Sequence, residues 1–207
     1  SVAYYGNYTL LTTKLSGLFN NFLGSSSAGV GNLIAEGNKE KIMCIYWELL
    51  SIRFFFAGVS AVFLYYVIPP FITLWLGAEY VMSQGVLILV ILSFVLGILR
   101  GTTDDFISGY GLFHDARTPL IESTIFVIVA LLGGMLWGLE GVLLGGIVSL
   151  LVLIYGWKPY FLFHHALHIP SRVYVLGFSK HLLCVVVGGI LFALSHVWLH
   201  LPSPTTS

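Results

Sequence analysis

Charged side chains are scarce in this chain: Asp, Glu, Lys and Arg make up 9% of 207 residues, whereas hydrophobic residues make up 57%. A water-soluble domain with this composition would lack the polar side chains that cover its surface. The nine basic and nine acidic residues also cancel to a formal net charge of zero. We therefore expect no nucleic-acid partner, because such partners select a basic surface. The composition instead predicts a protein surrounded by membrane lipids.

Cysteine is also scarce, with Cys44 and Cys184 standing alone and no CxxC spacing. Both are interpreted as small buried hydrophobic residues, and no metal or redox cofactor is expected. One local group of histidines comprises His164, His165 and His168. A membrane metal site would need several such groups to converge, so we interpret this one as a basic loop that contacts lipid headgroups.

The short alternating segments of a β-barrel are missing as well. The sequence instead contains charge-free runs of roughly the 20 residues that a helix needs to cross a hydrocarbon core about 30 Å thick. These runs predict an all-α, polytopic integral membrane protein, a single membrane domain over residues 1–207 with about six transmembrane helices. The predicted helices are 9–33, 44–68, 83–100, 120–138, 141–157 and 173–199.

No initiator Met and no basic segment typical of a signal peptide precede the first residues, Ser1-Val2-Ala3. We therefore interpret the chain as an internal fragment of a longer protein.

Lysine and arginine are missing from every second joint between the predicted helices. The joints 36–43, 100–119 and 158–172 all carry basic residues and should face the cytoplasm. The other set of joints should face outward, because its only charged residues are Glu79 and Glu140. That set comprises residues 1–8, 69–82, 138–141 and the tail from 200.

The first predicted helix differs from the others because it is amphipathic, and it should line protein or water. Lys14 lies about 8 Å inside the outer boundary if this span begins at Thr9. It either extends its ammonium to the outer interface or sits in a water-filled cavity, where it would attract an anionic substrate group. Asn20 and Asn21 lie nearer the middle, where they either hydrogen-bond to another helix or recognise sugar hydroxyls.

Arg53 lies near the inner end of the second predicted helix, five residues after Glu48. This offset points the two side chains about 140° apart, so each should face a different neighbour. Arg53 either extends to the cytoplasmic interface or lines a cavity.

Three further carboxylates lie on the inner side. Glu122 follows Pro119 at the inner mouth of the fourth helix. Like Arg53, it either extends to the cytoplasmic interface or lines a cavity, and a third alternative is a role as a proton-coupling group. Asp104 and Asp105, beside Arg100, are interpreted as part of a solvated or salt-bridged loop.

Several segments, in their order and spacing relative to the helices, resemble the polysaccharide or O-antigen flippases. This family of polysaccharide biosynthesis proteins belongs to the multidrug, oligosaccharidyl-lipid and polysaccharide exporter superfamily. The segments are GNYTL at 6–10, GNLIAE at 31–36, FITLWLG at 71–77, GLFHDAR at 111–117, PLIE at 119–122 and GLEGV at 138–142. As local structure, Gly31 should end a helix, Pro119 should start one, and Gly138 with Gly141 should form a tight outer turn. The sequence departs from the family at Gly146, where the family more often has Thr.

The resemblance implies a transporter of 12 to 14 helices in two lobes, of which this chain is most of the C-terminal lobe. Its substrate would be an undecaprenyl diphosphate-linked oligosaccharide, moved across the bacterial inner membrane for O-antigen, capsule or exopolysaccharide assembly. Lys14, Arg53 and Arg117 would offset the diphosphate and acidic sugars, with Arg117 alone inside a matched segment. The coupling ion would be a proton or sodium.

The resemblance also implies partners: membrane lipids, the missing N-terminal lobe and the polysaccharide polymerase machinery.

One alternative to a flippase is an intramembrane polymerase or transferase. Such an enzyme would carry a large basic outer loop, whereas the joint 69–82 is short and has no basic residue. A channel or structural membrane subunit is the other, and passive ion flux would distinguish it.

Overall fold

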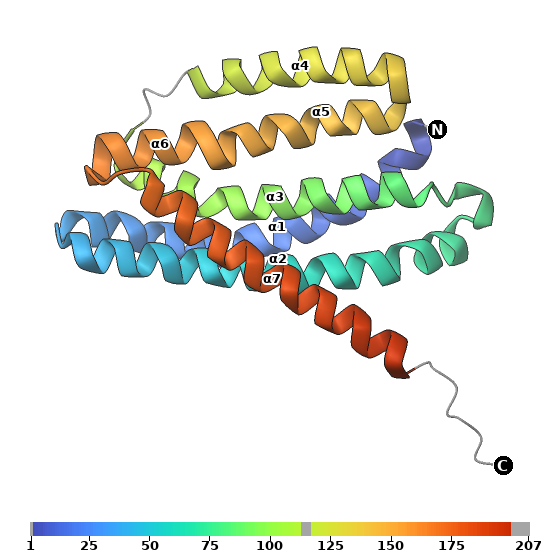
Figure 1. Cartoon of the computed structure of the whole chain (residues 1–207), viewed down its shortest axis with the longest axis horizontal. Coiled ribbons are helices and arrows are strands. Elements are labelled where there is room, and N and C mark those ends of the chain that lie inside the picture. Colours follow the sequence, from blue (N-terminus) through green and yellow to red (C-terminus); the bar gives the residue numbers. More distant parts are fainter. Residues whose placement is uncertain (1, 113–116, 200–207) are drawn as a thin grey trace.

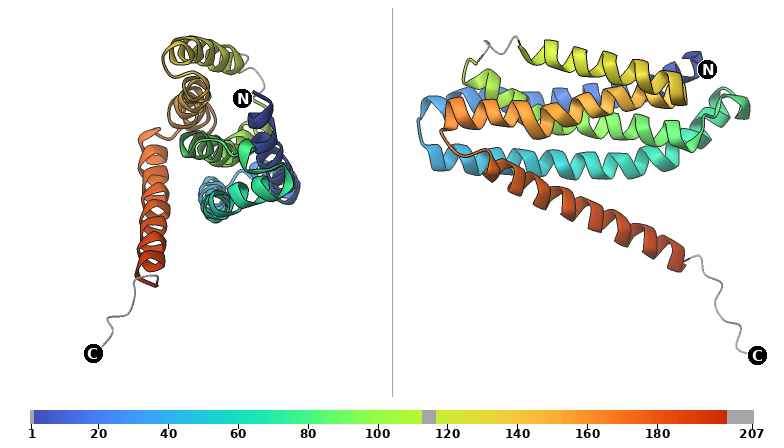
Figure 2. Two further views of the ribbon diagram at one scale, coloured as in Figure 1. Left: turned by 90° about the vertical axis from the view of Figure 1, so that its right-hand side faces the viewer. Right: turned by 45° about the horizontal axis from the view of Figure 1, so that its top comes forward.

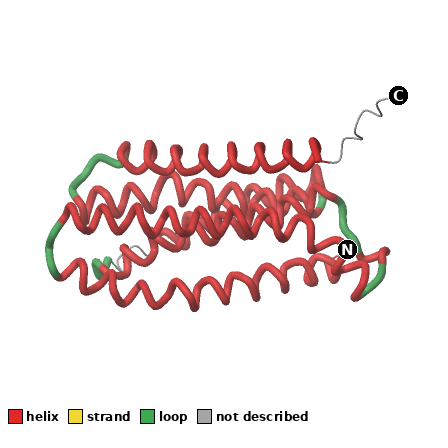
Figure 3. Tube along the Cα trace, turned by 90° about the horizontal axis from the view of Figure 1, so that it is seen from below, coloured by secondary structure: helices red, strands yellow, loops and turns green. Residues whose placement is uncertain are grey.

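The computed structural model describes residues 2–112 and 117–199, and helices account for nearly all of them (Figure 3). No strand occurs in these two ranges, which confirms the all-α prediction. The α-helices are α1 Val2–Ala35, α2 Lys39–Trp75, α3 Gln84–Gly109, α4 Arg117–Trp137, α5 Leu139–Val152, α6 Lys158–Leu162 and α7 Arg172–Leu199. Shorter segments are the 3-10 turn η1 Ala78–Tyr80 and the π-helical turns η2 Leu153–Trp157 and η3 Phe163–Leu167.

Five helices among the described residues are long and apolar enough to cross a membrane. They are α2, α3, residues 118–137 of α4, the continuous run from α5 to η3, and residues 172–191 of α7. The chain is therefore an all-α, multi-pass membrane protein. The first predicted span also forms a helix, α1, but α1 is not among the five.

The helices run up and down, so successive joints alternate between two ends of the molecule (Figure 1). Joints 36–38 and 168–171 lie at one end, at the left of Figure 1, with Lys39, Lys41 and Arg172 beside them. We call this the basic end. The joint 76–83 and the single turn residue Gly138 lie at the opposite end, together with the N-terminus. This alternation is the one that the joints predicted.

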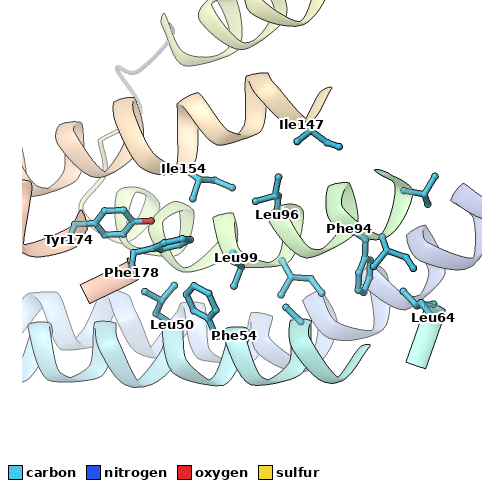
Figure 4. Close-up of a cluster of buried hydrophobic side chains, with 14 of the residues drawn as sticks. Leu50, Phe54, Leu64, Phe94, Leu96, Leu99, Ile147, Ile154, Tyr174 and Phe178 are labelled. Atoms are coloured by element: carbon cyan, nitrogen blue, oxygen red, sulfur yellow. The ribbon is translucent and has the colours of Figure 1, made fainter. Parts of the chain in front are cut away.

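Helix α3 lies at the centre and packs against α1, α2 and α5 (Figure 2). Helix α4 lies at the edge and packs mainly on α5, while α7 contacts α2 near the basic end and then diverges from the bundle. Buried side chains between these helices include Phe54, Leu99, Ile154 and Phe178 (Figure 4). In lipid such contacts hold helices together by close packing, because lipid tails are as apolar as the side chains.

The predicted end of the first helix is wrong, because Gly31 lies inside α1. The helix ends four residues later, and Gly37 follows it with a φ of 73°, a conformation that glycine adopts without a steric cost. Asn38 then begins α2 by accepting a hydrogen bond from the backbone N–H of Lys41 at 3.1 Å.

The joints are also shorter than predicted. Helix α2 continues through Pro69 and Pro70 to Trp75, so the outer joint starts at residue 76 rather than 69. Helix α3 continues to Gly109, and the run from α5 continues to Leu167, so charges assigned to the inner joints lie on helices. The physical reason is that these charges pair with one another across helices, which allows the helices to extend.

The hairpin of α4 and α5 depends on glycine. Gly138 alone makes the turn, with a φ of 59°. Gly141 was expected in that turn but lies inside α5, where a Cβ would overlap the carbonyl oxygen of Gly133. Gly145 is also close to α4, since its Cβ would lie 2.7 Å from the backbone nitrogen of Ala130. The α4 and α5 backbones therefore touch over several turns.

Substituting Gly145→Ala should lower the stability by about 1–3 kcal/mol, because a methyl group forces the two backbones apart. The neighbouring Gly146→Ala is the matched control, since its Cβ would meet only Phe126, at 4.0 Å. That change should be neutral or stabilising, because alanine favours the helix. Thermal unfolding in detergent, followed by circular dichroism, measures both, and equal melting temperatures would contradict the packing described.

Candidate functional site

Two groups of polar residues in the described part of the bundle are candidates for a functional site. The first is the polar face of α1, which we define as Thr13, Lys14, Asn20 and Asn21. The second is a cluster of charges toward the basic end, which we call the inner charge cluster. It comprises Arg53, Arg100, Asp104, Asp105, Glu122 and Lys158.

All four residues of the polar face of α1 are exposed. Lys14 lies about 18 Å along the helix from Val2, at about 1.5 Å per residue. It forms no ion pair or hydrogen bond with any other described residue. An unpaired ammonium and two amides at membrane depth are costly in lipid, so this face must contact water or further protein.

Glycines add space along the same side of α1. A Cβ on Gly17 or Gly24 would meet nothing within 4 Å. Gly17 follows Thr13 by four residues and Gly24 follows Asn20 by four, so both lie on the polar face. The described part of the protein therefore leaves this face uncovered along several turns.

Arg53 was expected either at the cytoplasmic interface or in the lining of a cavity, and the structure places it in neither environment. Its side chain is 6% exposed, and its guanidinium lies between α2 and α3, where it donates hydrogen bonds to Asp105 at 2.7 Å and to the Ile98 carbonyl oxygen at 3.2 Å. Gly101 makes this possible, because a Cβ there would overlap the guanidinium. Arg53 therefore neither extends to the interface nor presents a free cation to a cavity. Glu48 faces elsewhere, as expected, and accepts a hydrogen bond from the Cys44 thiol at 3.5 Å.

Arg100 connects its own helix, α3, to α4 within the inner charge cluster. It bonds both oxygens of Glu122 on α4, at 2.9 and 3.0 Å, and one oxygen of Asp104 at 3.0 Å. Asp104 also accepts a hydrogen bond from the ammonium of Lys158, which is buried at the start of α6. The salt-bridged interpretation of the Asp104 and Asp105 pair is therefore confirmed, although both lie on α3 rather than in a loop.

The described ion pairs of the inner charge cluster contain equal numbers of cations and carboxylates. Three cations, Arg53, Arg100 and Lys158, face three carboxylates, those of Asp104, Asp105 and Glu122. These ion pairs hold α2, α3, α4 and α6 together. Within the part of the chain that the structure describes, Lys14 and Lys180 are the two cations that lie away from helix ends and pair with no carboxylate, and Lys14 is the one on the polar face of α1.

Sequence reasoning missed the roles of Lys158 and His181. Lys158 follows the π-helical turn η2, a local feature that often marks functional sites but leaves no clear sequence signal. His181 joins α7 to α2: its ring stacks between Trp47 and Phe54, with ring centroids 5.9 and 5.6 Å away, and Ser51 lies 2.8 Å from its Nε2. One signal could have found part of the cluster, since Arg100 and Asp104 have the i,i+4 spacing of a helical ion pair.

The predicted histidine group lies at η3 and just beyond. His164 and His165 are exposed, and His168 ends the turn in a left-handed conformation with a φ of 56°. No cluster of three metal-ligating side chains occurs in ranges 2–112 and 117–199. The side chain of Arg117, like residues 113–116, lies outside the described residues.

An apolar groove of about 700 Å³ separates α2 from α7. Phe54, Phe55, Val59 and Val185 line it, with Ser51 and His181 toward the basic end. It exists because α7 diverges from the bundle beyond this contact (Figure 2).

No protein-family model, curated protein or solved structure matches this chain. The fold and the two polar regions therefore carry the functional argument.

Substituting Arg53→Met should destabilise the protein by about 3–5 kcal/mol, because it removes the buried guanidinium that pairs with Asp105. Lys41→Met is the matched control: Lys41 pairs with Glu36 at 2.6 Å, but both side chains are about half exposed. Loss of such a surface pair costs about 0–1 kcal/mol. Unfolding in detergent measures both, and the double variant Arg53→Met/Asp105→Leu should recover part of the loss. Equal effects of Arg53→Met and Lys41→Met would contradict the buried pair.

Proposed function

We propose that this chain is part of a flippase that exports an undecaprenyl diphosphate-linked oligosaccharide across the bacterial inner membrane, for O-antigen, capsule or exopolysaccharide assembly. One observation carries the proposal: the polar face of α1, with an unpaired lysine, lies exposed beside five apolar helices. A lipid-linked sugar needs such a polar path, because its hydroxyl and diphosphate groups cannot cross hydrocarbon unaided. The resemblance of the segments at 6–10, 31–36, 71–77, 111–117, 119–122 and 138–142 to polysaccharide flippases supports the same function.

Within this proposal Lys14 attracts the diphosphate or an acidic sugar, and Asn20 and Asn21 bond to sugar hydroxyls. The amides can act as both donors and acceptors, which suits hydroxyl groups. The protein is a transporter rather than an enzyme, and its missing lobe would cover the polar face of α1. Glu122 remains a candidate for ion coupling, and its bond to Arg100 would have to open for it to take up a proton.

Substituting Lys14→Leu in the complete gene should reduce surface-polysaccharide export by roughly tenfold or more. A hydrogen bond to a charged group contributes about 1.5–3 kcal/mol, and each 1.4 kcal/mol is a factor of ten. Lys14→Arg should retain export, since the charge is kept. Lys180→Leu, which removes another exposed lysine of a long helix, is the matched control and should export normally. Surface polysaccharide is measured at equal protein level, and normal export by Lys14→Leu would remove Lys14 from the substrate path.

The orientation can be tested with single cysteines. In a Cys44→Ser/Cys184→Ser background, a maleimide that cannot cross the membrane should label Ala78→Cys in intact cells, because the joint 76–83 should face outward. Asn38→Cys, at the basic end, should react only after the cells are opened. Labelling of Asn38→Cys in intact cells would reverse the proposed orientation.

A further inference from the structure

A second polar feature of α1 lies on the flank that faces α3. A hollow of about 240 Å³ opens between the two helices in their halves nearer the N-terminal end of the molecule. Six of its eight lining residues carry a hydroxyl group. The lining residues are Tyr5, Thr9, Thr12, Thr13, Ser16, Val90, Ser93 and Phe94.

The five serine and threonine hydroxyl groups fall into two sets by their hydrogen bonds. Thr9 and Thr12 donate to backbone carbonyl oxygens of the preceding turn, at 3.0 and 3.1 Å, so their lone pairs remain free to accept. The hydroxyls of Thr13, Ser16 and Ser93 bond to no other described residue, so they can donate as well as accept. The hollow therefore presents donors and acceptors together at a depth where lipid offers neither.

This combination suits a neutral polyol. Adjacent ring hydroxyls each donate one hydrogen bond and accept others, which matches a mixed set of free hydroxyls. A bare cation fits less well, because no carboxylate lines the hollow and an unpaired charge at this depth is costly. A volume of about 240 Å³ is also below the roughly 300–1,000 Å³ of drug-sized ligand sites, which limits the occupant to about one ring.

The hollow is continuous with the polar face of α1. Thr9, Thr13, Ser16 and Asn20 follow one another at intervals of four, three and four residues, so they form one stripe along the helix. Asn20 is the deepest member of this stripe. A ligand that contacts Asn20 can therefore reach the hollow without leaving the polar surface.

We propose that the hollow between α1 and α3 binds one neutral sugar ring of the transported oligosaccharide, through the hydroxyls of Thr13, Ser16 and Ser93. This inference rests on the proposed transport function, since it names where the sugar part of that substrate is held. Phe94 offers an apolar surface for the C–H face of the ring. The site lies beside Lys14, so the charged and neutral parts of the substrate would be bound by different residues.

Saturation-transfer NMR on the purified full-length protein in nanodiscs tests the inference. The probes are the methyl glycosides of glucose, galactose, mannose and N-acetylglucosamine, with cyclohexanol as the control for adsorption to apolar surfaces. At least one glycoside should receive saturation well above cyclohexanol. The double variant Thr13→Val/Ser93→Ala, nearly equal in shape to the native pair, should reduce that signal by about tenfold, the loss expected for two neutral hydrogen bonds.

The matched control is Thr73→Val/Ser108→Ala, which makes the same chemical changes at exposed positions outside the hollow. It should bind the glycoside as well as the native protein, and equal melting temperatures of the two variants would exclude a general loss of fold. No glycoside signal above cyclohexanol, or equal signals from both double variants, would overturn the inference. Normal export by Lys14→Leu would count against the proposed role of Lys14 without affecting this result, so the two proposals fail separately.

Discussion

A hydrocarbon environment offers no hydrogen-bond partner, and this constraint governs the whole molecule. Nearly all of the described backbone is helical, which satisfies the peptide groups within each segment. Charged side chains follow the same rule: Arg53, Arg100 and Lys158 each contact a carboxylate. The polar face of α1 is an exception among the described residues, because its lysine and its two amides remain exposed together. An exception of this kind indicates a surface that water or another protein segment meets, which is why the functional proposal rests on it.

The helices are joined with unequal strength. Glycines bring α4 and α5 into backbone contact, and the inner charge cluster fixes α3 to α2, α4 and α6. By contrast α7 is attached near the basic end, where His181 stacks between Trp47 and Phe54, and then leaves an apolar groove. Because lipid tails compete equally for apolar surfaces, helices in a membrane associate where small residues or polar bonds favour contact. The distribution of those two features explains why α4 and α5 form a tight pair whereas α7 diverges.

Much of the fold could be predicted from the sequence, whereas only part of the candidate site could. The helical class, the alternation of joints and the unusual polarity of the first helix follow from local composition. The joint boundaries were wrong at Gly31, Pro69 and Gly141, because a glycine or proline ends a helix only where packing permits it. Lys14, Asn20 and Asn21 were predicted as candidate substrate-binding residues, with extension to the interface or bonding to another helix as the alternatives, and the structure leaves all three side chains exposed. The partner of Arg53 could not be predicted, since Asp105 lies 52 residues away in the sequence.

The amino-acid sequence by itself determined that this protein is helical, that it lies in lipid and that basic residues collect at one end. Each of these properties depends on the length and composition of single segments, which short stretches of sequence contain in full. Only the tertiary structure decided that Arg53 is neutralised while Lys14 is not, and that hydroxyls of α1 and α3 enclose one hollow. Those outcomes depend on how each helix rotates about its axis and which neighbour it meets. Such relations arise from side-chain packing between residues that are far apart in the chain.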